Sequence, residues 1–588
     1  MISLTARLGE LVGDAFAAEG LERALGAVRV SDRPDLAPFQ CNGALAAAKA
    51  AKTNPRQLAE AVRGRLEDSP ELAEVTLAGP GFLNLTPSNA CVERLLAALQ
   101  ADAHGGGYRT ARPEKVVLDY GGPNVAKPLH VGHLRSAIIG QSLKAIFRRV
   151  GDDAVGDIHL GDWGLQMGQL ITEIARRRPE LPYFDADMTE GFPTESPVTV
   201  DDLAEIYPAA SAACKADADR MAEAQRATAE LQAGRPGYVA LWRHFVDVSR
   251  AALERDYQRL GVDFELWRGE ASADPFIAPT IERLRAKGLL TESDGAQVVD
   301  VAREGDKKEV PPLLMVKSNG SVGYGSTDLA TLLQRSEEGF DRCIYVVDKR
   351  QSEHFTQVFR AAAMLGLFAE ESMEHAGFGT MNGRDGRPFK TREGGVLKLA
   401  DLLQMVIGKA EERVRENRVG EGTGAEARAE IARLVGLAAL KFADLSNPRT
   451  TDYIFDLDRF VAFEGKTGPY LLYAAVRMRS VLRKAGVAPE DAAAAPVALA
   501  DRAERDLATA LLGYADAQRS AYQRRMPHIL CEHVFAVAQA FSKFYAACRI
   551  ADEENITARN SRLALTSVTL TQVTDVLDQL GIAVPEQM

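Results

Sequence analysis

Two stretches of this chain share one order of elements: a short apolar run, a loop, and then an amphipathic helix. In the first stretch, the run VVLDY leads through the loop GGPNVAKPLHVG to a helix whose apolar face carries Ile139, Leu143, Ile146 and Val150. Gly151 is placed to end that helix. In the second stretch, an apolar run at 343–347 precedes a helix over 352–365 that ends at Gly366. Two such units predict a doubly wound parallel sheet, with ligands at the carboxyl ends of its strands.

The length of 588 residues exceeds what one hydrophobic core usually organises, so several domains of roughly 100 to 150 residues are expected. The Gly-rich stretch HGGGY at 104–108 is typical of a linker, and residues 185–240 turn acidic and then Ala-rich, as in an insertion. The predicted order is an N-terminal α/β domain (1–110), the first half of the sheet domain (111–184), the insertion (185–240), the second half (241–400) and a C-terminal helical bundle (401–588).

Composition narrows the class of protein. Hydrophobic residues make up 46% of the chain and charged residues 26%, which is an ordinary globular balance. No apolar run approaches the roughly 20 residues of a membrane-spanning helix, and the opening MISLTARLGELVGDAF lacks the basic head of a signal peptide. A soluble, cytoplasmic protein is expected. The net charge of -12 argues against a protein that coats nucleic acid indiscriminately but allows local basic patches that dock a folded RNA.

The six cysteines are widely spaced, with no CxxC or CxxH pair. This spacing predicts neither a zinc site nor a disulfide framework, and favours small core residues.

The segment DYGGPNVAKPLHVGHLRS has the features of a nucleotide site. His130 and His133 stand three residues apart at the expected start of a helix, where free backbone N–H groups and the helix dipole favour phosphate. Gly132 leaves room for a flat base or ribose against the backbone, and Lys127 adds a mobile positive charge. The alternative for the two histidines alone is that they are satisfied by local helix caps.

A second basic segment, MNGRDGRPFKTREGG at 381–395, places four cations in a Gly-rich loop: Arg384, Arg387, Lys390 and Arg392. Cations placed in advance can stabilise a pyrophosphate leaving group, although an isolated case would more simply be a solvated hairpin. A third segment, HLGDWGLQMG at 159–168, offers His159, Gly161 and Asp162 as the lining of an ATP pocket. The alternative there is packing around Trp163.

Together these segments resemble one enzyme family. HVGH with the preceding Pro123-Asn124 and the following Leu134-Arg135-Ser136 closely resembles the ATP signature of class I aminoacyl-tRNA synthetases, in the form found in arginyl-tRNA synthetases. Residues 389–392 (FKTR) are similar to that family's form of the KMSK loop, although Arg392 and Glu393 stand where a second lysine is expected in the class. In the arginyl family this departure goes with a lysine upstream of HxGH, which Lys127 matches. The resemblance therefore implies that Lys127 and Lys390 together supply the positive charge that stabilises the pyrophosphate.

The resemblance implies a Rossmann-like catalytic domain and assigns roles to single residues. The catalytic residues would be Lys127, His130, His133 and Lys390. The ATP-binding residues would be His130, Gly132, His133, His159, Gly161, Asp162 and Lys390. ATP would enter as its Mg²⁺ complex, and no zinc or organic cofactor is expected.

A guanidinium substrate demands carboxylates in fork geometry. Asp119 lies at the carboxyl end of the first predicted strand, where ligands bind. Asp328 begins a predicted helix one turn after Tyr324, so Asp328 and Tyr324 can face one pocket. Each acid could instead be an ordinary helix cap. The residues that match the family's arginine pocket are Asp119, Asn124, His130, Tyr324, Asp328 and, across a possible one-residue gap, Gln351.

Further along, the segment at 464–486 predicts a helix with exposed aromatic and basic side chains, which suit unstacked RNA bases and phosphates; core aromatics and a solvated basic face are the alternative. It resembles the family's helical anticodon-binding domain, and the implied tRNA contacts are Tyr470, Ala474, Arg477 and the terminal Met588. Near the N-terminus, APFQCNGALAAAK resembles the additional domain that touches the tRNA elbow. It implies contacts by Gln40 and Asn42, although Pro38-Phe39 replaces the usual Asp-Tyr pair.

The predicted activity is that of an arginine–tRNA ligase, with L-arginine, ATP and tRNA-Arg as partners and a monomeric state. Members of the family need tRNA even for amino-acid activation, so the same is expected here. The competing hypotheses are another class I synthetase, an HxGH nucleotidyltransferase, and a non-catalytic tRNA-binding paralogue.

Overall fold

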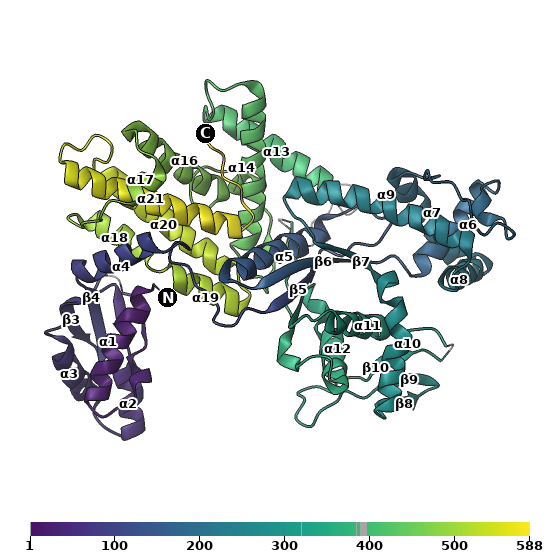
Figure 1. The fold of residues 1–588 in the computed structure, drawn as a ribbon, viewed down its shortest axis with the longest axis horizontal. Helices are drawn as coiled ribbons and strands as arrows, with labels where there is room; N and C mark the ends of the chain where they lie inside the picture. The colour runs from purple at the N-terminus through teal and green to yellow at the C-terminus, as the bar shows by residue number, and fades with distance from the viewer. Residues whose placement is uncertain (1, 34, 319, 384, 388–396) are drawn as a thin grey trace. The chain divides into compact units, whose positions relative to one another are not determined.

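The computed structural model describes residues 2–33, 35–318, 320–383, 385–387 and 397–588, and these form two compact units that interleave along the chain (Figure 1). The terminal unit comprises Met1–Ala111, Ala410–Phe442 and Phe460–Met588. The central unit comprises Arg112–Lys409 and Ala443–Arg459. Helices α13 (Leu399–Glu416), α14 (Ala425–Leu445) and α15 (Leu457–Phe460) each begin in one unit and end in the other.

The central unit is built on a five-stranded sheet in which every neighbouring pair is parallel, in the order β12-β11-β5-β6-β7. The strands are β5 (Lys115–Tyr120), β6 (Asp153–Leu160), β7 (Leu266–Gly269), β11 (Arg342–Val346) and β12 (Met373–His375). The chain runs outwards from β5 to β7 and then returns to the other side of β5, so the strand order reverses between β5 and β11. The predicted doubly wound sheet is confirmed, and this reversal is where such sheets bind ligands.

The helices of the central unit connect these strands. They are α5 (Val131–Val150), α6 (Leu165–Arg177), η2 (Pro182–Phe184), α7 (Val200–Ala216), α8 (Ala218–Gln232), α9 (Pro236–Leu260), α10 (Glu270–Ala286), α11 (Tyr324–Glu337), η3 (Lys349–Gln351), α12 (Ser352–Leu365) and η4 (Glu370–Ser372). α7 and α8, which come from the stretch expected to be an insertion, pack against α6 and α9 on either side of it in the sequence.

Two small sheets complete the central unit. β8 (Leu290–Ser293), β9 (Ala296–Val299) and β10 (Leu313–Val316) form an antiparallel sheet. β13 (Met381–Asn382) and β14 (Tyr453–Ile454) form a parallel pair, so residues more than 70 positions apart are joined just before the basic loop.

Local sequence explains the elements that carry the site. β5 is buried over its whole length after Lys115, which suits a central parallel strand with both faces covered. α5 has His130 as its N-cap and ends at Gly151, whose φ of 112° lies in the left-handed region that only glycine adopts at low cost. Val117 of β5, Tyr345 of β11 and Val358 of α12 belong to one buried apolar cluster, which holds these elements in place.

The terminal unit combines an α/β part and a helical part. The first contains α1 (Leu4–Ala18), η1 (Arg23–Gly26), α2 (Gly43–Ala51), α3 (Pro55–Leu66), α4 (Asn89–Ala101) and the antiparallel sheet β1-β2-β4-β3, with β1 (Val28–Val30), β2 (Phe39–Cys41), β3 (Leu72–Ala78) and β4 (Phe82–Pro87). The second contains α16 (Gly468–Ala485), α17 (Pro489–Ala493), α18 (Arg502–Leu511), α19 (Tyr514–Arg524), α20 (His528–Ala547) and α21 (Ile556–Gln579). The predicted N-terminal α/β domain and C-terminal helical domain are confirmed.

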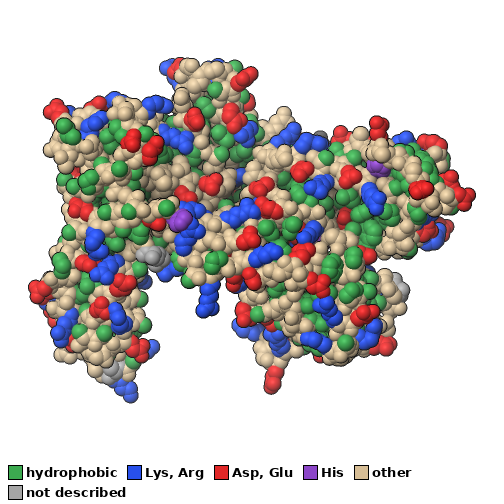
Figure 2. Space-filling model, viewed as in Figure 1, with side chains coloured by type: hydrophobic (Ala, Val, Ile, Leu, Met, Phe, Trp, Pro, Cys, Tyr) green, Lys and Arg blue, Asp and Glu red, His purple; other side chains and the backbone are tan. Residues whose placement is uncertain are grey.

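All six cysteines are buried with free thiols, as expected of small core residues. Among the helices of the described residues, none has the length and apolarity to cross a membrane. Figure 2 shows acidic and basic side chains interspersed over the face in view, in keeping with a chain that lacks a dominant basic composition.

Candidate active site

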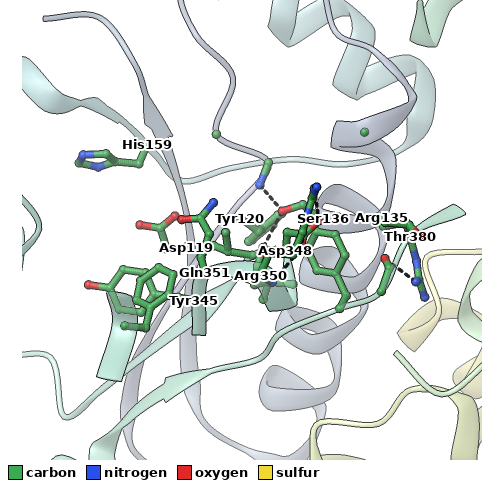
Figure 3. Close-up of a pocket in the computed structure, with 18 of the residues that line it drawn as sticks. Asp119, Tyr120, Arg135, Ser136, His159, Tyr345, Asp348, Arg350, Gln351 and Thr380 are labelled. Carbon is green, nitrogen blue, oxygen red and sulfur yellow. Dashed lines mark hydrogen bonds and ion pairs between the residues drawn. The ribbon is translucent and has the colours of Figure 1, made fainter. Parts of the chain in front are cut away.

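A cavity of about 630 Å³ opens at the carboxyl ends of β5 and β11, where the strand order reverses (Figure 3). Its lining includes six of the predicted site residues: Asp119, His130, Gly132, His159, Asp328 and Gln351. It also includes residues that the sequence had not singled out, among them Tyr345, Asp348, Arg350, Phe378 and Thr380.

His130 and His133 start helix α5 by capping it. His130 Nδ1 accepts a hydrogen bond from Gly132 N at 3.0 Å, and His133 Nδ1 accepts one from His130 N at 3.2 Å. Their ring centroids lie 3.9 Å apart. The cap that stood as an alternative to phosphate binding is therefore present, and the two roles are compatible, because a ring that accepts through Nδ1 carries its proton on Nε2.

Both imidazoles are held neutral. Burial lowers the pKa of His130, and the nearby positive charge of Lys127 lowers it further. Burial also lowers the pKa of His133, to about 3, and the second cause there is the neighbouring His130. Gly132 is needed for this arrangement, since a Cβ there would lie 2.7 Å from His130 Cε1. Each ring is thus a neutral N–H donor at Nε2 whose tautomer is fixed by the backbone, and of the two only His130 is among the residues that line the cavity.

Asp119 is held from behind by a buried arginine. Arg335 of α11 donates from Nη2 to Asp119 Oδ2 at 2.7 Å and to Asp157 Oδ2 at 2.6 Å, and the side chains of Arg335 and Asp157 have no exposed area. Burial raises the pKa of Asp119, and the Arg335 charge opposes that shift. Asp119 Oδ2 is thereby committed to Arg335, while the residue lines the cavity.

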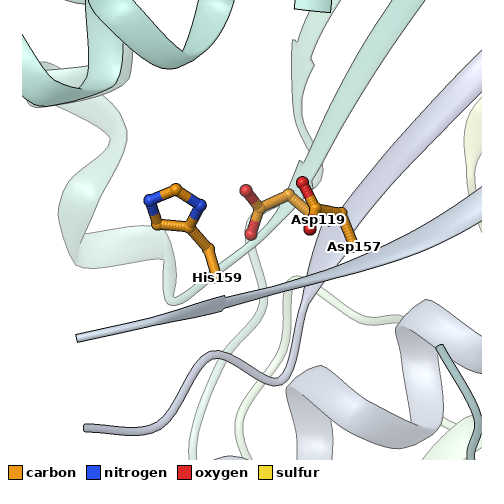
Figure 4. A group of neighbouring side chains, drawn as sticks. All are labelled: Asp119, Asp157 and His159. Atoms are coloured by element: carbon orange, nitrogen blue, oxygen red, sulfur yellow. The ribbon is translucent and has the colours of Figure 1, made fainter. Parts of the chain in front are cut away.

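Asp119, Asp157 and His159 form a close group that has the residue types of a metal site (Figure 4). The guanidinium of Arg335 already bonds both carboxylates, so the cation that these acids need is supplied by the chain. We therefore assign no metal to this group.

Asp328 and Tyr324 lie differently from each other. α11 begins at Tyr324 with Gly323 as its N-cap, so Asp328 is in the second turn and does not cap the helix, contrary to the alternative left open by the sequence. Asp328 lines the cavity, and its Oδ2 lies 2.5 Å from His354 Nε2 of α12. Tyr324 is 78% exposed and is not part of the cavity lining.

Three predicted site residues are not among those that line the cavity and instead take part in backbone contacts, namely Asn124, Gly161 and Asp162. Asn124 and Gly161 form an isolated bridge, and a Cβ on Gly161 would lie 2.2 Å from Asn124 Oδ1. Asp162 is 5% exposed, accepts from Ala271 N at 3.0 Å near the start of α10, and has its pKa raised to about 6 by burial. These contacts fix the loops around His159, whose buried Nδ1 has no hydrogen-bond partner among the described residues.

Lys127 lies outside the cavity lining. Its Nζ is 4.8 Å from the ring centroid of Tyr207 on α7, a cation–π contact. The residue before it, Ala126, has a φ of 65°, in the left-handed region that alanine seldom adopts.

Lys390, Arg392 and Arg384 lie outside the described residues. The described residues on either side of 388–396 do reach the cavity and the helix start. Thr380 and Met381 line the cavity on one side. On the other, Val131 N donates to Leu397 O at 3.0 Å, beside His130.

Arg135 of α5, named by the sequence only as part of the signature, ties that helix to the strand before the loop. It is 2% exposed, donates from Nε to Asp444 Oδ2 at 3.0 Å, and donates from Nη1 to Gly379 O at 2.7 Å and Thr451 O at 3.0 Å. Its guanidinium also lies over the rings of Phe378 and Tyr453.

Sequence reasoning missed Arg335, Asp157 and His354. The sequence pattern did indicate that Arg335 is buried, because it follows Leu329 and Leu332 at intervals of three residues, which places all three on one helix face. Asp157 likewise stands in the apolar run of β6. A charged residue on an otherwise apolar face requires a buried partner, but the sequence does not say which.

In the terminal unit, a second cavity of about 630 Å³ gathers three of the four C-terminal residues expected to contact tRNA, namely Tyr470, Ala474 and Arg477. Arg477 donates to Tyr473 Oη at 2.9 Å, and its guanidinium lies 5.2 Å from the Tyr545 ring. Tyr470 Oη lies 3.1 Å from Ser542 Oγ. Met588 is not among the residues that line this cavity.

The two N-terminal candidates differ in access. Asn42 is exposed and makes no side-chain cap for α2. Gln40 is 9% exposed and donates from Nε2 to Asn84 Oδ1 at 3.1 Å, so its amide is largely occupied within the sheet.

Comparison with known proteins identifies the family of each part of the chain. The family described as tRNA synthetases class I (R), catalytic domain, matches residues 94–457; the DALR anticodon binding domain matches 471–588; and the arginyl tRNA synthetase N terminal domain matches 4–86. The chain is 53% identical over 591 residues to the arginine–tRNA ligase of Hyphomonas neptunium and 51% identical over 593 residues to that of Maricaulis maris, with 100% of each chain covered.

Two solved structures share the fold. The arginyl-tRNA synthetase of Plasmodium falciparum superposes with a TM-score of 0.83 at 23% identity, covering 100% of this chain and 99% of that one. The enzyme of Thermus thermophilus superposes with a TM-score of 0.79 at 22% identity, covering both chains fully. On the family matches and the full-length relatives, the chain belongs to the arginyl-tRNA synthetase family of class I aminoacyl-tRNA synthetases.

Proposed function

We propose that this chain activates L-arginine with ATP–Mg²⁺ to arginyl-adenylate and transfers the arginyl group to the terminal adenosine of tRNA-Arg, releasing pyrophosphate and then AMP. The observation that carries the proposal is the shared cavity: the start of α5, suited to phosphate, and the carboxylates of Asp119 and Asp328, suited to a guanidinium, line the same space. Activation needs both substrates in one place, with the arginine carboxylate in reach of the α-phosphorus.

For the ATP half, we assign phosphate contacts to His130, His133, Lys127 and Lys390. The neutral imidazoles donate through Nε2, and the N-terminus of α5 adds its dipole. When the arginine carboxylate attacks the α-phosphorus, the bond to pyrophosphate breaks and negative charge builds on the leaving group. Fixed donors aimed at that charge lower the barrier without a protein nucleophile. Gly132, His159, Gly161 and Asp162 shape the adenosine side of the site.

For the arginine half, we assign the guanidinium to Asp119 and Asp328. Asn124, His130, Tyr324 and Gln351 complete the proposed pocket. Two carboxylates favour a cationic side chain and repel glutamate or aspartate, which separates this chain from synthetases for acidic amino acids. Because Tyr324 is exposed in this structure, its part in the pocket requires that its side chain turn inwards when arginine binds.

For the tRNA half, we assign elbow contacts to Gln40 and Asn42 in the region 1–110, and anticodon contacts to Tyr470, Ala474, Arg477 and Met588 in the region 401–588. The regions 111–184 and 241–400 would carry the chemistry, with 185–240 as an insertion. Aromatic rings beside an arginine suit unstacked bases. The cavity that holds Tyr470, Ala474 and Arg477 supports this assignment.

The test is ATP–pyrophosphate exchange with each amino acid, with and without cognate tRNA. We expect exchange with arginine only, and only when tRNA is present. Exchange driven by another amino acid would point to a different class I synthetase, and tRNA binding without charging would point to a non-catalytic paralogue. The cytoplasmic location and the monomeric state stay predictions, and sedimentation of the purified chain checks the second.

A further inference from the structure

Both carboxylates proposed for the substrate guanidinium already hold a cationic or potentially cationic group of the chain. Asp119 pairs with Arg335, and Asp328 pairs with His354, whose Nε2 lies 2.5 Å from Asp328 Oδ2. The two partners differ in kind. Arg335 has no exposed area and keeps its charge at every pH, whereas His354 can lose a proton.

The His354–Asp328 pair is partly exposed to solvent. The two side chains are 30% and 32% exposed, and Asp328 lines the cavity. Solvent and substrate can therefore both reach the pair. A ligand cation that binds Asp328 enters the space next to a protonated imidazole.

The hydrogen bond from Asp328 raises the pKa of His354, and burial opposes this in part. The histidines at the helix start shift the other way, since burial lowers the pKa of His130 and of His133. The charge of Asp328 also reaches Glu270 of α10 and Tyr345 of β11, whose pKa values are raised mainly by burial and to a lesser degree by Asp328. Near neutral pH, His354 therefore carries more of a proton than either histidine of the signature.

We infer that His354 is a positioning residue, which holds Asp328 in place before arginine binds and gives its proton to solvent as the guanidinium takes over that carboxylate. The inference rests on the proposed function, because it takes Asp328 as a guanidinium ligand. Two cations on one carboxylate repel each other, so bound arginine lowers the pKa of His354 below its value in the free protein. Protonation then opposes arginine binding, and binding releases up to one proton.

The sign of the pH dependence follows. The free protein has the higher His354 pKa, so arginine binds tightest above that pKa and more weakly as the pH falls through it. With one linked proton, the limiting loss is roughly tenfold in affinity per pH unit. The loss should appear as a higher KM for arginine at low pH. The kcat at saturating arginine should change little, because protonated His354 opposes arginine binding and not the chemical step.

The experiment is calorimetric titration of L-arginine into the full chain, in two buffers of different ionisation enthalpy at pH 6 and at pH 8. The dependence of the observed heat on the buffer gives the number of protons released. For the wild type we expect proton release at pH 6 that declines as the pH rises. H354Q retains an N–H donor towards Asp328 but cannot be protonated, so it should release none at either pH and show a flat arginine KM.

H244Q is the matched control, because His244 lies on α9 and bonds to Tyr183 and Pro193, away from the cavity. It should behave as wild type. Equal proton release by H354Q and wild type would overturn the inference, as would no release by wild type at pH 6. If H354Q fails to fold, the wild-type measurement still decides. Absence of any arginine binding at both pH values with cognate tRNA present would instead overturn the proposed function and this inference with it.

Discussion

Asp119 and Arg335 form an ion pair beneath the substrate cavity: Arg335 Nη2 donates to Asp119 Oδ2 at 2.7 Å, and the arginine side chain is fully buried. Exchanging Arg335 for Met would leave Asp119 beside Asp157 with no cation between them. Removing one partner of a buried pair costs about 3 to 5 kcal/mol, so we expect a loss of that size in the free energy of unfolding, measured in urea. Arginine affinity should fall as well, because a protonated Asp119 cannot pair with a guanidinium.

The pH dependence of that variant has a definite sign. Without Arg335, the folded-state pKa of Asp119 rises further above its unfolded value, so its contribution is favourable at low pH and is lost as the pH rises through the folded pKa. The deficit of R335M should therefore be smaller at pH 5 than at pH 8. Adding D157N should recover part of the stability. A deficit that is equal at both pH values would show that lost packing, and not charge, explains the effect.

His133 has two proposed roles, capping helix α5 through Nδ1 and donating to a phosphate through Nε2, and a substitution can separate them. H133N keeps an acceptor close to the position of Nδ1 but has no donor in place of Nε2. We expect pyrophosphate exchange to fall roughly 10² to 10³-fold, as when one transition-state donor is lost, with little change in unfolding. H133A should lose the cap as well, at about 1 kcal/mol. If H133N keeps full exchange activity, the imidazole serves only as a cap.

The low pKa of His133 also affects stability. The unfolded residue takes up a proton near its ordinary pKa, whereas the folded residue does so only at about 3. The contribution of His133 is therefore present above the unfolded pKa and is lost as the pH falls towards 3. Urea unfolding of H133N should depend less steeply on pH between 6.5 and 5 than that of wild type.

Arg135 and Asp444 are coupled across the central unit, with 2% and 0% of their side chains exposed. R135M should lower the free energy of unfolding by about 3 to 5 kcal/mol, because Asp444 stays buried without its cation. R135M/D444N should be more stable than R135M. A double-mutant cycle in urea measures the coupling, and additive effects would contradict it.

Tyr207 holds the ammonium of Lys127 over its ring. Y207A removes that contact, worth roughly 0.5 to 1 kcal/mol, and leaves Lys127 less localised. We expect KM for ATP to rise about two- to fivefold while KM for arginine is unchanged. Y207F keeps the ring and is the matched control. A change in both KM values would show a general disturbance of α7.

Arg477 is positioned by Tyr473 and Tyr545 at the second cavity. If it contacts a tRNA phosphate, R477Q should weaken tRNA binding at low salt. The slope of log affinity against log salt should become shallower by about 1. R502Q is the control, since Arg502 is exposed on α18 outside that cavity. An unchanged slope would argue for a role in packing alone.

The local parts of the structure were predictable from sequence. The strand β5, the helix α5 and the glycine that ends it follow from apolar periodicity and one left-handed residue, and these signals act within a few positions. The signature motif then located one side of the cavity.

The pairings across the site were not predictable. Arg335 and Asp119 are 216 positions apart, and Arg135 and Asp444 are 309 apart, so no local pattern links them. Nor could the sequence place the start of α11, which decides that Asp328 is a cavity residue and not a cap. The sequence also posed capping and ligand binding as alternatives for His130 and His133, whereas different nitrogens of one ring can serve each.

The interleaving of the two units has a consequence for biosynthesis. Residues 112–409 leave the ribosome before the return segment Ala443–Arg459, which brings Asp444 to Arg135 and β14 to β13. Until then the nascent domain holds an arginine with no counter-charge and a strand with no neighbour, which are features that delay closure and attract chaperones. A fragment of residues 112–409 should therefore aggregate. The same fragment should fold when 443–459 is appended through a flexible linker.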